Sequence, residues 1–272
     1  MNNSYLSVSV IVTTRNEEWN IASCLKSVFE QSYQKENMEV IVVDNNSGDE
    51  TKKIAESFRR ESTPLNLQIF NQGPERSAQR NYGAEKSSGK YIIYLDADMI
   101  LSPDVISECV GELEKNNKIA ALRVPEIIVG ENFWNKVRRF ERNFYNGTVI
   151  DAARFIRRDI FVKIGGFDEA LTGPEDWDLD KKIKKIGPIG IIKNSLYHNE
   201  GEFSVKKYLA KKAYYGQNFQ KYITKWGKDD SDIKKQFGFS YRYFQVFLEN
   251  GKWKKLVRHP ILTLGMYFLR FL

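Results

Sequence analysis

The chain has 272 residues, 42% of them hydrophobic, which is enough to bury the core of one domain with or without a tail. Its two cysteines, Cys24 and Cys109, lie far apart, which excludes a disulfide framework and a cysteine-based metal site. The formal charge of +7 arises in the last quarter, because residues 201–272 hold 15 lysines and arginines against 5 acids, whereas the first 200 residues hold 27 against 30.

Targeting and membrane-spanning segments are not expected. The first nine residues, Met1 to Ser9, lack the apolar stretch of a signal peptide. The apolar runs are far shorter than the ~20 residues that a membrane-spanning helix needs. Together with the unpaired cysteines, this predicts a cytoplasmic protein that is soluble or lies on a membrane surface.

Strands and helices alternate in the first half of the chain. The predicted strands, rich in β-branched residues, are 8–14, 39–43, 67–70 and 91–95. The helices predicted between them are 21–29, about 50–60, and 77–87. This alternation predicts a mostly parallel sheet with helices on both faces, in which ligands bind beyond the carboxyl ends of the strands.

Both element types continue in the second half. The expected helices end near Lys115, cover 133–146, surround Phe161 and begin at 173–178. The expected strands are 120–129, 150–156, 189–192 and 195–198. The fold class is therefore α/β throughout this region.

The strand 91–95 leads directly into two aspartates, Asp96 and Asp98, separated by one alanine. Alternate residues of an extended chain share a side, so both carboxylates are expected to point the same way. Two such charges are unfavourable together unless a cation lies between them, and their oxygens suit Mg²⁺ or Mn²⁺. The bare pattern also occurs in solvated loops.

The neighbouring strand ends favour the cation site over the solvated loop. Thr13, Arg15 and Asp44 also follow predicted strands, so a parallel sheet would gather them with the two aspartates in one crevice. No Gly-x-Gly-x-x-Gly motif and no Walker lysine loop follows the first strand, which counts against a dinucleotide enzyme and a P-loop ATPase.

Six short sequence motifs occur between residues 13 and 179. They are Thr13–Glu17, Val43–Thr51, Ala78–Gly83, Leu95–Asp98, Gly165–Glu169 and Glu175–Leu179. In this order they resemble the motifs of glycosyltransferase family 2, whose members are inverting, nucleotide-sugar-dependent enzymes with a GT-A fold. The resemblance implies a Rossmann-like GT-A domain over residues 1–200, with a nucleotide-binding half of about 1–100 and an acceptor half of about 101–200. The Gln-x-x-Arg-Trp motif of processive members is absent, which implies transfer of a single sugar.

The resemblance implies a site for a UDP- or GDP-linked sugar. Thr13, Arg15 and Glu17 would line the base and ribose of the nucleotide. Asp44 would accept a hydrogen bond from the base, and its alternative role is to cap a turn.

The resemblance also implies a divalent cation, Mn²⁺ or Mg²⁺, that stabilises the leaving nucleoside diphosphate. Asp96 would hold the ribose or the metal, and Asp98 would bind the metal. His198 would complete the metal site or serve as a structural histidine. Arg76 and Arg80 are candidate cations for the donor, and the matched motif favours Arg80.

On the acceptor side, Asp176 matches the catalytic base of the family, with Glu175 and Trp177 beside it as acceptor-binding residues. A carboxylate in a partly closed site can act as a base near neutral pH. The alternative for Asp176 is an acid that stabilises the first turn of a helix.

The basic C-terminal extension, residues 201–272, needs its own explanation. A basic helix with interleaved aromatic residues is predicted at 203–215, and the nearly apolar segment 261–272 is long enough to lie in one leaflet but too short to span a bilayer. We expect peripheral attachment to the inner face of the cell membrane and a lipid-linked or cell-surface acceptor, such as a polyprenyl phosphate. Packing on the catalytic domain and a homodimer contact are the alternatives, and no nucleic-acid recognition motif is present.

Two other functions compete with sugar transfer. A sugar-nucleotide nucleotidyltransferase would carry a glycine-rich triphosphate loop after the first strand, and 13–20 contains no glycine. A non-catalytic module that binds sugars or lipid carriers would have lost the metal or base motif, and both are intact.

Overall fold

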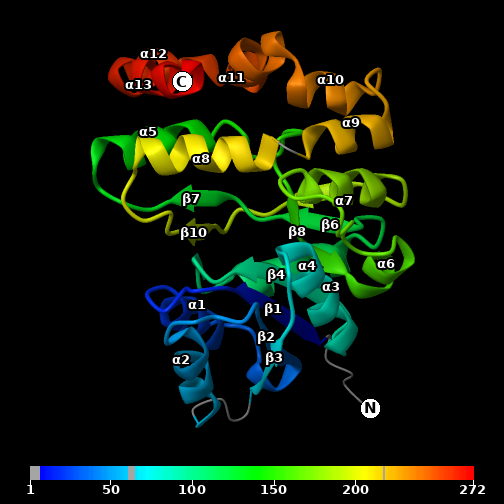
Figure 1. Ribbon diagram of the computed structural model, residues 1–272. Coiled ribbons are helices and arrows are strands. Elements are labelled where there is room, and N and C mark those ends of the chain that lie inside the picture. The colour runs from blue at the N-terminus through cyan, green and yellow to red at the C-terminus, as the bar shows by residue number, and fades with distance from the viewer. Residues whose placement is uncertain (1–6, 61–64, 217) are drawn as a thin grey trace.

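A seven-stranded sheet forms the centre of the computed structural model, which describes residues 7–60, 65–216 and 218–272 (Figure 1). The strands, in their order across the sheet, are β3 (Asn66–Asn71), β2 (Met38–Asp44), β1 (Val8–Thr14), β4 (Tyr91–Asp96), β8 (Ala153–Arg157), β6 (Ala121–Arg123) and β9 (Ile189–Ile191). The first four are parallel, and β8 is antiparallel to both of its neighbours. The predicted mostly parallel sheet is confirmed. The N-terminal stretch expected to lack a signal peptide lies largely outside the described residues.

Helices cover both faces of this sheet because alternate strand residues point to opposite sides. One core joins Val10 and Val12 to α1 (Ile21–Phe29), α2 (Thr51–Ser57) and α4 (Val105–Lys115). The other joins Ile11 and Tyr94 to α3 (Arg76–Lys86), α6 (Arg158–Lys163) and α7 (Glu175–Lys184). The strand ends between these two layers remain open to a ligand.

A second, three-stranded sheet holds β5 (Met99–Leu101), β10 (Leu196–His198) and β7 (Glu126–Ile128). The strand character expected over 120–129 is confirmed, but the segment is divided between β6 and β7 in different sheets. Pro125 stands at the division, and its missing N–H cannot continue a ladder.

The two aspartates after β4 do not point the same way, contrary to expectation. The strand ends at Asp96, and residues 97–98 form a turn that carries the chain into β5. Asp96 faces the arginines of α3, whereas Asp98 faces His198 on β10. The alternation rule fails because it requires extended backbone beyond Asp96.

The C-terminal extension packs on α5 (Phe133–Arg142). Its helices are α8 (Val205–Gly216), α9 (Phe219–Trp226), α10 (Ser231–Phe237), the π-helical turn η3 (Tyr241–Gln245), α11 (Val246–Leu248), α12 (Trp253–Arg258) and α13 (Pro260–Phe271). Met266 and Leu269 of α13 are fully buried in the core that includes Val137. Gly265 allows the close approach, since a Cβ there would lie 2.8 Å from the Val137 methyl group.

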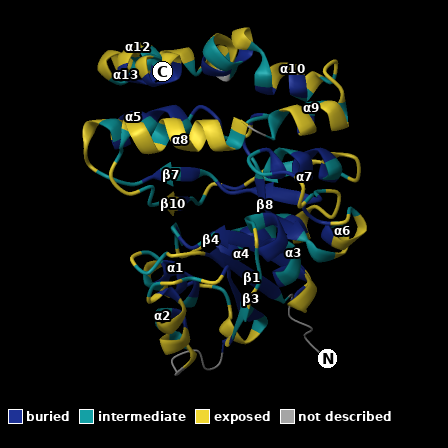
Figure 2. Ribbon diagram, in the orientation of Figure 1, coloured by how far each residue is buried: buried dark blue, intermediate teal, exposed yellow. Residues whose placement is uncertain are grey.

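The opposite face of α13 is open to solvent, as Figure 2 shows. Ile261, Leu264 and Phe268 are 68%, 73% and 54% exposed. Among the described residues, no helix combines the length and the apolar character needed to cross a membrane. The extension therefore packs on the core and also presents an apolar surface.

Candidate active site

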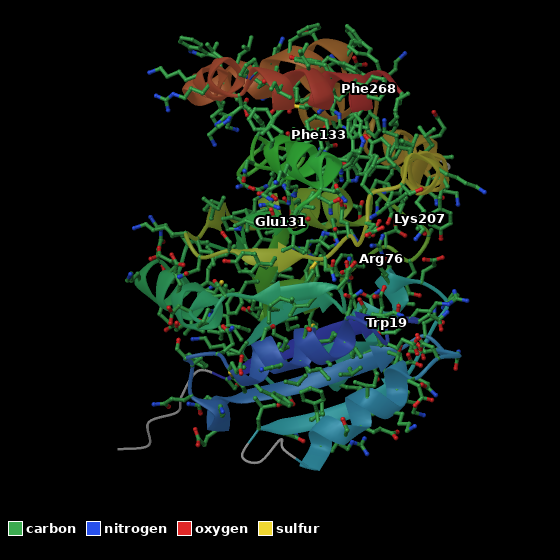
Figure 3. The ribbon with its side chains drawn as sticks, turned by 90° about the vertical axis from the view of Figure 1, so that its left-hand side faces the viewer. Trp19, Arg76, Glu131, Phe133, Lys207 and Phe268 are labelled. Carbon is green, nitrogen blue, oxygen red and sulfur yellow. The ribbon has the colours of Figure 1, made fainter. Side chains whose placement is uncertain are left out.

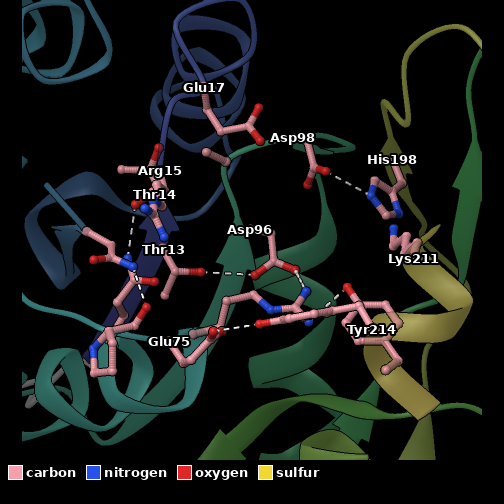
Figure 4. Close-up of a pocket in the computed structure, with 16 residues that line it drawn as sticks. Thr13, Thr14, Arg15, Glu17, Glu75, Asp96, Asp98, His198, Lys211 and Tyr214 are labelled. Atoms are coloured by element: carbon pink, nitrogen blue, oxygen red, sulfur yellow. Dashed lines mark hydrogen bonds and ion pairs between the residues drawn. The ribbon is translucent and has the colours of Figure 1, made fainter. Parts of the chain in front are cut away.

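A polar cavity of about 320 Å³ lies at the carboxyl ends of β1 and β4 (Figure 4). These strands are parallel neighbours in which Thr13 pairs with Asp96. The cavity is lined by Thr13, Thr14, Arg15, Glu17, Asn45, Pro74, Glu75, Arg76, Gln79, Asp96, Ala97, Asp98, His198, Lys211, Tyr214 and Tyr215. The convergence of strand ends expected from the sequence is thus confirmed for Thr13, Arg15, Asp96 and Asp98, but not for Asp44.

Asp96 lies at the centre of a cluster of hydrogen bonds and ion pairs. Its Oδ1 accepts hydrogen bonds from Thr13 Oγ1 and from Arg80 Nη2, each at 2.9 Å, and Arg76 Nη1 lies 3.6 Å from its Oδ2. Burial alone would raise the pKa of Asp96, but the guanidinium groups of Arg80 and Arg76 hold it well below its usual range. Asp96 is therefore an anion that is already compensated by the protein.

Arg80 links Asp96 to Asp176. Its Nη1 donates to Asp176 Oδ1 at 2.9 Å, and its guanidinium lies 4.7 Å from the ring centre of Tyr94 and 5.1 Å from that of Phe167. The residue is 1% exposed and lies behind Asp96, outside the cavity wall. Arg80 thus fixes two carboxylates in place.

Arg76, one turn earlier on α3, lines the cavity instead. Its Nη2 donates to Glu175 Oε1 and to Tyr215 Oη, both at 3.1 Å, and its side chain is 33% exposed. Of the two arginines that the sequence offered as donor-site cations, the structure brings Arg76 to the wall. The preference for Arg80 stays a prediction.

Asp98 and His198 both line the cavity and contact each other directly, as the dashed line in Figure 4 marks. Asp98 Oδ2 lies 3.0 Å from His198 Nε2, and Glu126 Oε1 lies 2.8 Å from Nδ1. Burial alone lowers the pKa of His198, but hydrogen bonds to the two carboxylates raise it to about 10. The two ring nitrogens are thus bonded to two carboxylates, and Nε2 must lose its proton before it can bind a metal ion.

The residues around Asp98 fit a divalent cation with an open coordination sphere. Among the described residues, Asp98 Oδ1 is buried without a hydrogen-bond partner. No group of three or more histidine, cysteine, aspartate or glutamate side chains in this part of the chain is arranged as a metal cage. A carboxylate and an imidazole suit Mn²⁺, and either Mn²⁺ or Mg²⁺ can take its remaining ligands from phosphate and water.

Arg15 and Glu17 line the cavity beside Thr13, as the sequence predicted. Glu17 accepts a hydrogen bond from Asn20 Nδ2 at 2.7 Å. Burial and the nearby charge of Asp98 raise the pKa of Glu17, although the Asn20 hydrogen bond opposes this. These residues form the side of the cavity next to β1 and α1.

Asp44 does not reach the cavity wall. Both of its carboxylate oxygens accept hydrogen bonds from Ser47, one from the backbone N–H at 2.9 Å and one from the hydroxyl group. Asp44 therefore caps a turn, and the adjacent Asn45 contributes to the wall. Its role in binding the base stays a prediction.

Trp177 points away from the cavity. Its indole N–H donates to the carbonyl of Ile150 at 3.1 Å, and its ring packs against Phe219 and Phe237. Glu175 and Asp176, by contrast, lie in the first turn of α7 and form ion pairs with the arginines of α3. Glu175 pairs with Arg76, and Asp176 pairs with Arg80. The proposed acceptor residues are thus separated in space, with Glu175 near the cavity and Trp177 in the aromatic cluster.

Helix α8 closes one side of the cavity, which the sequence did not indicate. Lys211, Tyr214 and Tyr215 reach the wall, and Tyr214 Oη donates to Glu75 Oε1 at 2.6 Å. Glu126 was also missed as the second partner of His198. Its only signal was that it is the one acidic residue in the predicted strand 120–129, whose other charged residue is Arg123.

The strand order and the polar cavity at the strand ends define a Rossmann-like α/β protein. A family model described as glycosyl transferase family 2 matches residues 9–167, more than half of the chain. The protein belongs to glycosyltransferase family 2.

Individual relatives cover parts of this chain. The glycosyltransferase AglE of Haloferax volcanii is 44% identical over 91 residues, which are 34% of this chain and 30% of AglE. The chain spans between 29% and 47% of the lengths of AglE and two Bacillus subtilis relatives.

Two solved structures share the fold. The mannosyltransferase PcManGT from Pyrobaculum calidifontis, in complex with GDP-Man and Mn²⁺, has a TM-score of 0.64 at 21% identity and covers 96% of this chain and 74% of its own. TarS 1–349 from S. aureus, in complex with UDP-GlcNAc, has a TM-score of 0.57 at 21% identity and covers 73% of this chain and 60% of its own. Both support the GT-A fold.

Proposed function

We propose that the protein transfers a single sugar from a UDP- or GDP-linked donor to an acceptor hydroxyl, with inversion and with Mn²⁺ or Mg²⁺. The observation that carries this proposal is the placement of Asp96 and the Asp98–His198 pair in the wall of one cavity at the strand ends. Asp176 does not line this cavity, but Arg80 joins its carboxylate to that of Asp96. The nucleotide sugars in the complexes of PcManGT and TarS support the class of donor.

The proposed chemistry divides between Asp176, which does not line the cavity, and the residues of the cavity wall. Asp176 accepts the proton of the acceptor hydroxyl as its oxygen bonds to the anomeric carbon of the sugar, while the bond from that carbon to the diphosphate breaks. Arg80 orients the Asp176 carboxylate through the 2.9 Å ion pair. Arg76 and Lys211 supply positive charge at the wall for the leaving nucleoside diphosphate. Asp98 and His198 would hold the cation, which when bound stabilises the negative charge of the diphosphate.

The acceptor is a lipid-linked or cell-surface glycan precursor at the inner face of the cell membrane. The apolar face of α13 and the lysines of α8 support a peripheral contact with anionic lipid. Residues 1–200 would then form the catalytic domain and residues 201–272 the extension that holds it at the surface.

The test is nucleotide release from a panel of UDP-, GDP- and dTDP-sugars with Mn²⁺. We expect release from one nucleotide class, and its loss when the cation is chelated. Release of pyrophosphate from a nucleoside triphosphate and a sugar phosphate would instead indicate a nucleotidyltransferase. Binding of a sugar nucleotide without any turnover would indicate a binding module.

A further inference from the structure

A second cavity, of about 100 Å³, lies beside the strand-end cavity. It is lined by Asn135, Arg138, Glu200, Gly201, Glu202, Phe203, Ser204, Lys207, Tyr208 and Lys211. Lys211 lines both cavities, and the segment 198–200 connects them because His198 faces the first and Glu200 the second. A ligand in the second cavity would therefore lie next to the proposed reaction site.

The charges in the second cavity favour an anion. Glu200 is bound to Arg138, with nitrogen–oxygen distances of 3.3 and 3.4 Å, and Lys211 lies 3.9 Å from its carboxylate. Within the described part of the chain, the Lys207 ammonium has no ion-pair partner, and α8 contains four lysines and no acid. Glu202 is exposed at the rim. After Glu200 is compensated by Arg138 and Lys211, Lys207 is the unpaired cation among the described residues that line the cavity, and Glu202 is the unpaired acid at its rim.

A buried polar group in this cavity also lacks a partner. Asn135 is 3% exposed, and its Nδ2 donates to the carbonyls of Val129 and Gly201, each at 2.9 Å. These two bonds fix the orientation of the amide, which leaves Oδ1 buried without a partner among the described residues. This oxygen accepts only, so a phosphate group can satisfy it through the P–OH of its singly protonated form.

A series of aromatic rings runs from the second cavity to the exposed face of α13. Phe203 lies 5.7 Å from Tyr208 and 5.7 Å from Trp134, measured between ring centres. Trp134 then stacks on Phe268 at 5.6 Å, and Phe268 is 54% exposed beside the apolar residues of α13. In Figure 3, Lys207 lies between Arg76 of the first cavity and the exposed rings of Phe133 and Phe268.

We propose that the second cavity binds the phosphate group of a lipid-phosphate acceptor, with its hydrocarbon chain along Phe203, Trp134 and Phe268. This inference rests on the proposed function and identifies the acceptor class and its subsite. Lysines bind the phosphate, and the aromatic series carries the chain toward the apolar face of α13. A water-soluble sugar or polymer would have no use for this apolar path.

The phosphate subsite is tested with farnesyl phosphate, a short isoprenyl phosphate, whose binding to the full chain is measured by titration calorimetry. Lys207→Glu reverses a charge that lines the cavity, and Lys206→Glu makes the same change on the neighbouring exposed lysine outside it. We expect binding to weaken about tenfold or more in Lys207→Glu, as expected for loss of a charge-assisted contact, and by less than about twofold in Lys206→Glu. Equal losses in the two variants would overturn the subsite.

The lipid path is tested by Phe203→Ala, with Phe239→Ala as a control at an exposed phenylalanine outside the aromatic series. Phe203→Ala should weaken farnesyl phosphate and leave binding of inorganic phosphate unchanged, while Phe239→Ala should change neither. If inorganic phosphate binds as tightly as farnesyl phosphate to the wild type, the lipid path is wrong.

Nucleotide release from the sugar nucleotide in the absence of acceptor separates the two proposals. Release in the wild type without any farnesyl phosphate binding would overturn the acceptor subsite alone. Farnesyl phosphate binding without release from any sugar nucleotide would instead contradict the proposed function.

Discussion

The two arginines of α3 differ in burial, and their substitution should have different effects. Arg80 is 1% exposed and compensates both Asp96 and Asp176. Arg80→Met leaves two carboxylates near a buried site without their cation, so the free energy of unfolding should fall by about 3 kcal/mol or more. Urea denaturation followed by circular dichroism measures this loss.

Arg76→Met is the matched control, because the Arg76 side chain is 33% exposed and lines the cavity. Its removal leaves the buried Glu175 without its cation, but Arg80 still compensates Asp96, so the stability cost should be smaller than that of Arg80→Met. The affinity for the nucleotide sugar should drop. If Arg76→Met destabilised the protein as much as Arg80→Met, the division of roles between the two arginines would be wrong.

The sequence predicted which residues gather at the strand ends but not which atoms face the cavity. Asp98 and His198 are 100 residues apart, yet both follow strands, so their approach could be expected. The choice between Arg76 and Arg80 depends on the packing of α3 against Tyr94 and Phe167, which no local pattern encodes. The position of the Trp177 ring is likewise set by its packing against Phe219 and Phe237, and not by the neighbouring acids Glu175 and Asp176.

At the scale of elements, the parallel strands were predicted almost to the residue. β1, β2 and β4 are nearly continuous buried runs rich in β-branched or aromatic residues, whereas β3 is shorter and only partly buried. The division of the segment 120–129 into β6 and β7 was not predicted, because its residues suit a strand of either sheet. Pro125 interrupts the hydrogen-bond ladder between the two strands. Helix α8 was expected as a basic helix, but none of its residues is buried, so its place over the cavity depends on contacts such as that of Tyr214 with Glu75.

Glu108 joins α4 to the loop before β10, which carries His198. Its carboxylate accepts hydrogen bonds from the backbone N–H groups of Lys193 and Asn194 at 2.9 and 2.8 Å, and from Asn194 Nδ2 at 2.8 Å. We expect Glu108→Gln to lower the free energy of unfolding by about 1–2 kcal/mol at neutral pH, since charge-assisted hydrogen bonds become neutral ones.

The loss in Glu108→Gln should depend on pH. Partial burial raises the pKa of Glu108, but the hydrogen bonds from Asn194 and Lys193 outweigh it and hold the pKa below the ordinary 4.5. The ionised form therefore stabilises the folded protein above that pH, and this contribution disappears as the pH falls through the folded pKa. Denaturation curves of both proteins should converge in acid, and a constant difference would contradict the assignment.

At the scale of the whole molecule, we expect the C-terminal extension to contact the membrane while it remains packed on the rest of the protein. Deleting α13 would expose Val137 of α5 to water, so substitutions are the sharper test. Ile261→Glu with Leu264→Glu changes two side chains that are 68% and 73% exposed. We expect the two substitutions to lower the free energy of unfolding by only about 0.5 kcal/mol. Co-sedimentation of the protein with anionic vesicles should fall strongly.

Substitution of an exposed residue on another surface provides the control for that experiment. Val162→Glu changes a side chain that is 60% exposed on α6, a helix that lies far from α13 in Figure 1. Equal vesicle binding by the wild type and the α13 double variant would contradict the membrane proposal. Loss of binding in both the α13 double variant and Val162→Glu would indicate a non-specific effect of charge.

In the proposed mechanism, Asp98 takes part in donor binding and Asp176 in the chemical step. Asp176→Asn keeps the size of the side chain and a partner for Arg80 but removes the base, and Asp98→Ala removes the proposed metal ligand. The decisive measurement combines titration of the donor nucleotide with Mn²⁺ and nucleotide release on the same Asp176→Asn sample. We predict donor binding within about threefold of the wild type, a change below 1 kcal/mol, with turnover abolished, while Asp98→Ala loses both. Full turnover in Asp176→Asn would contradict the account.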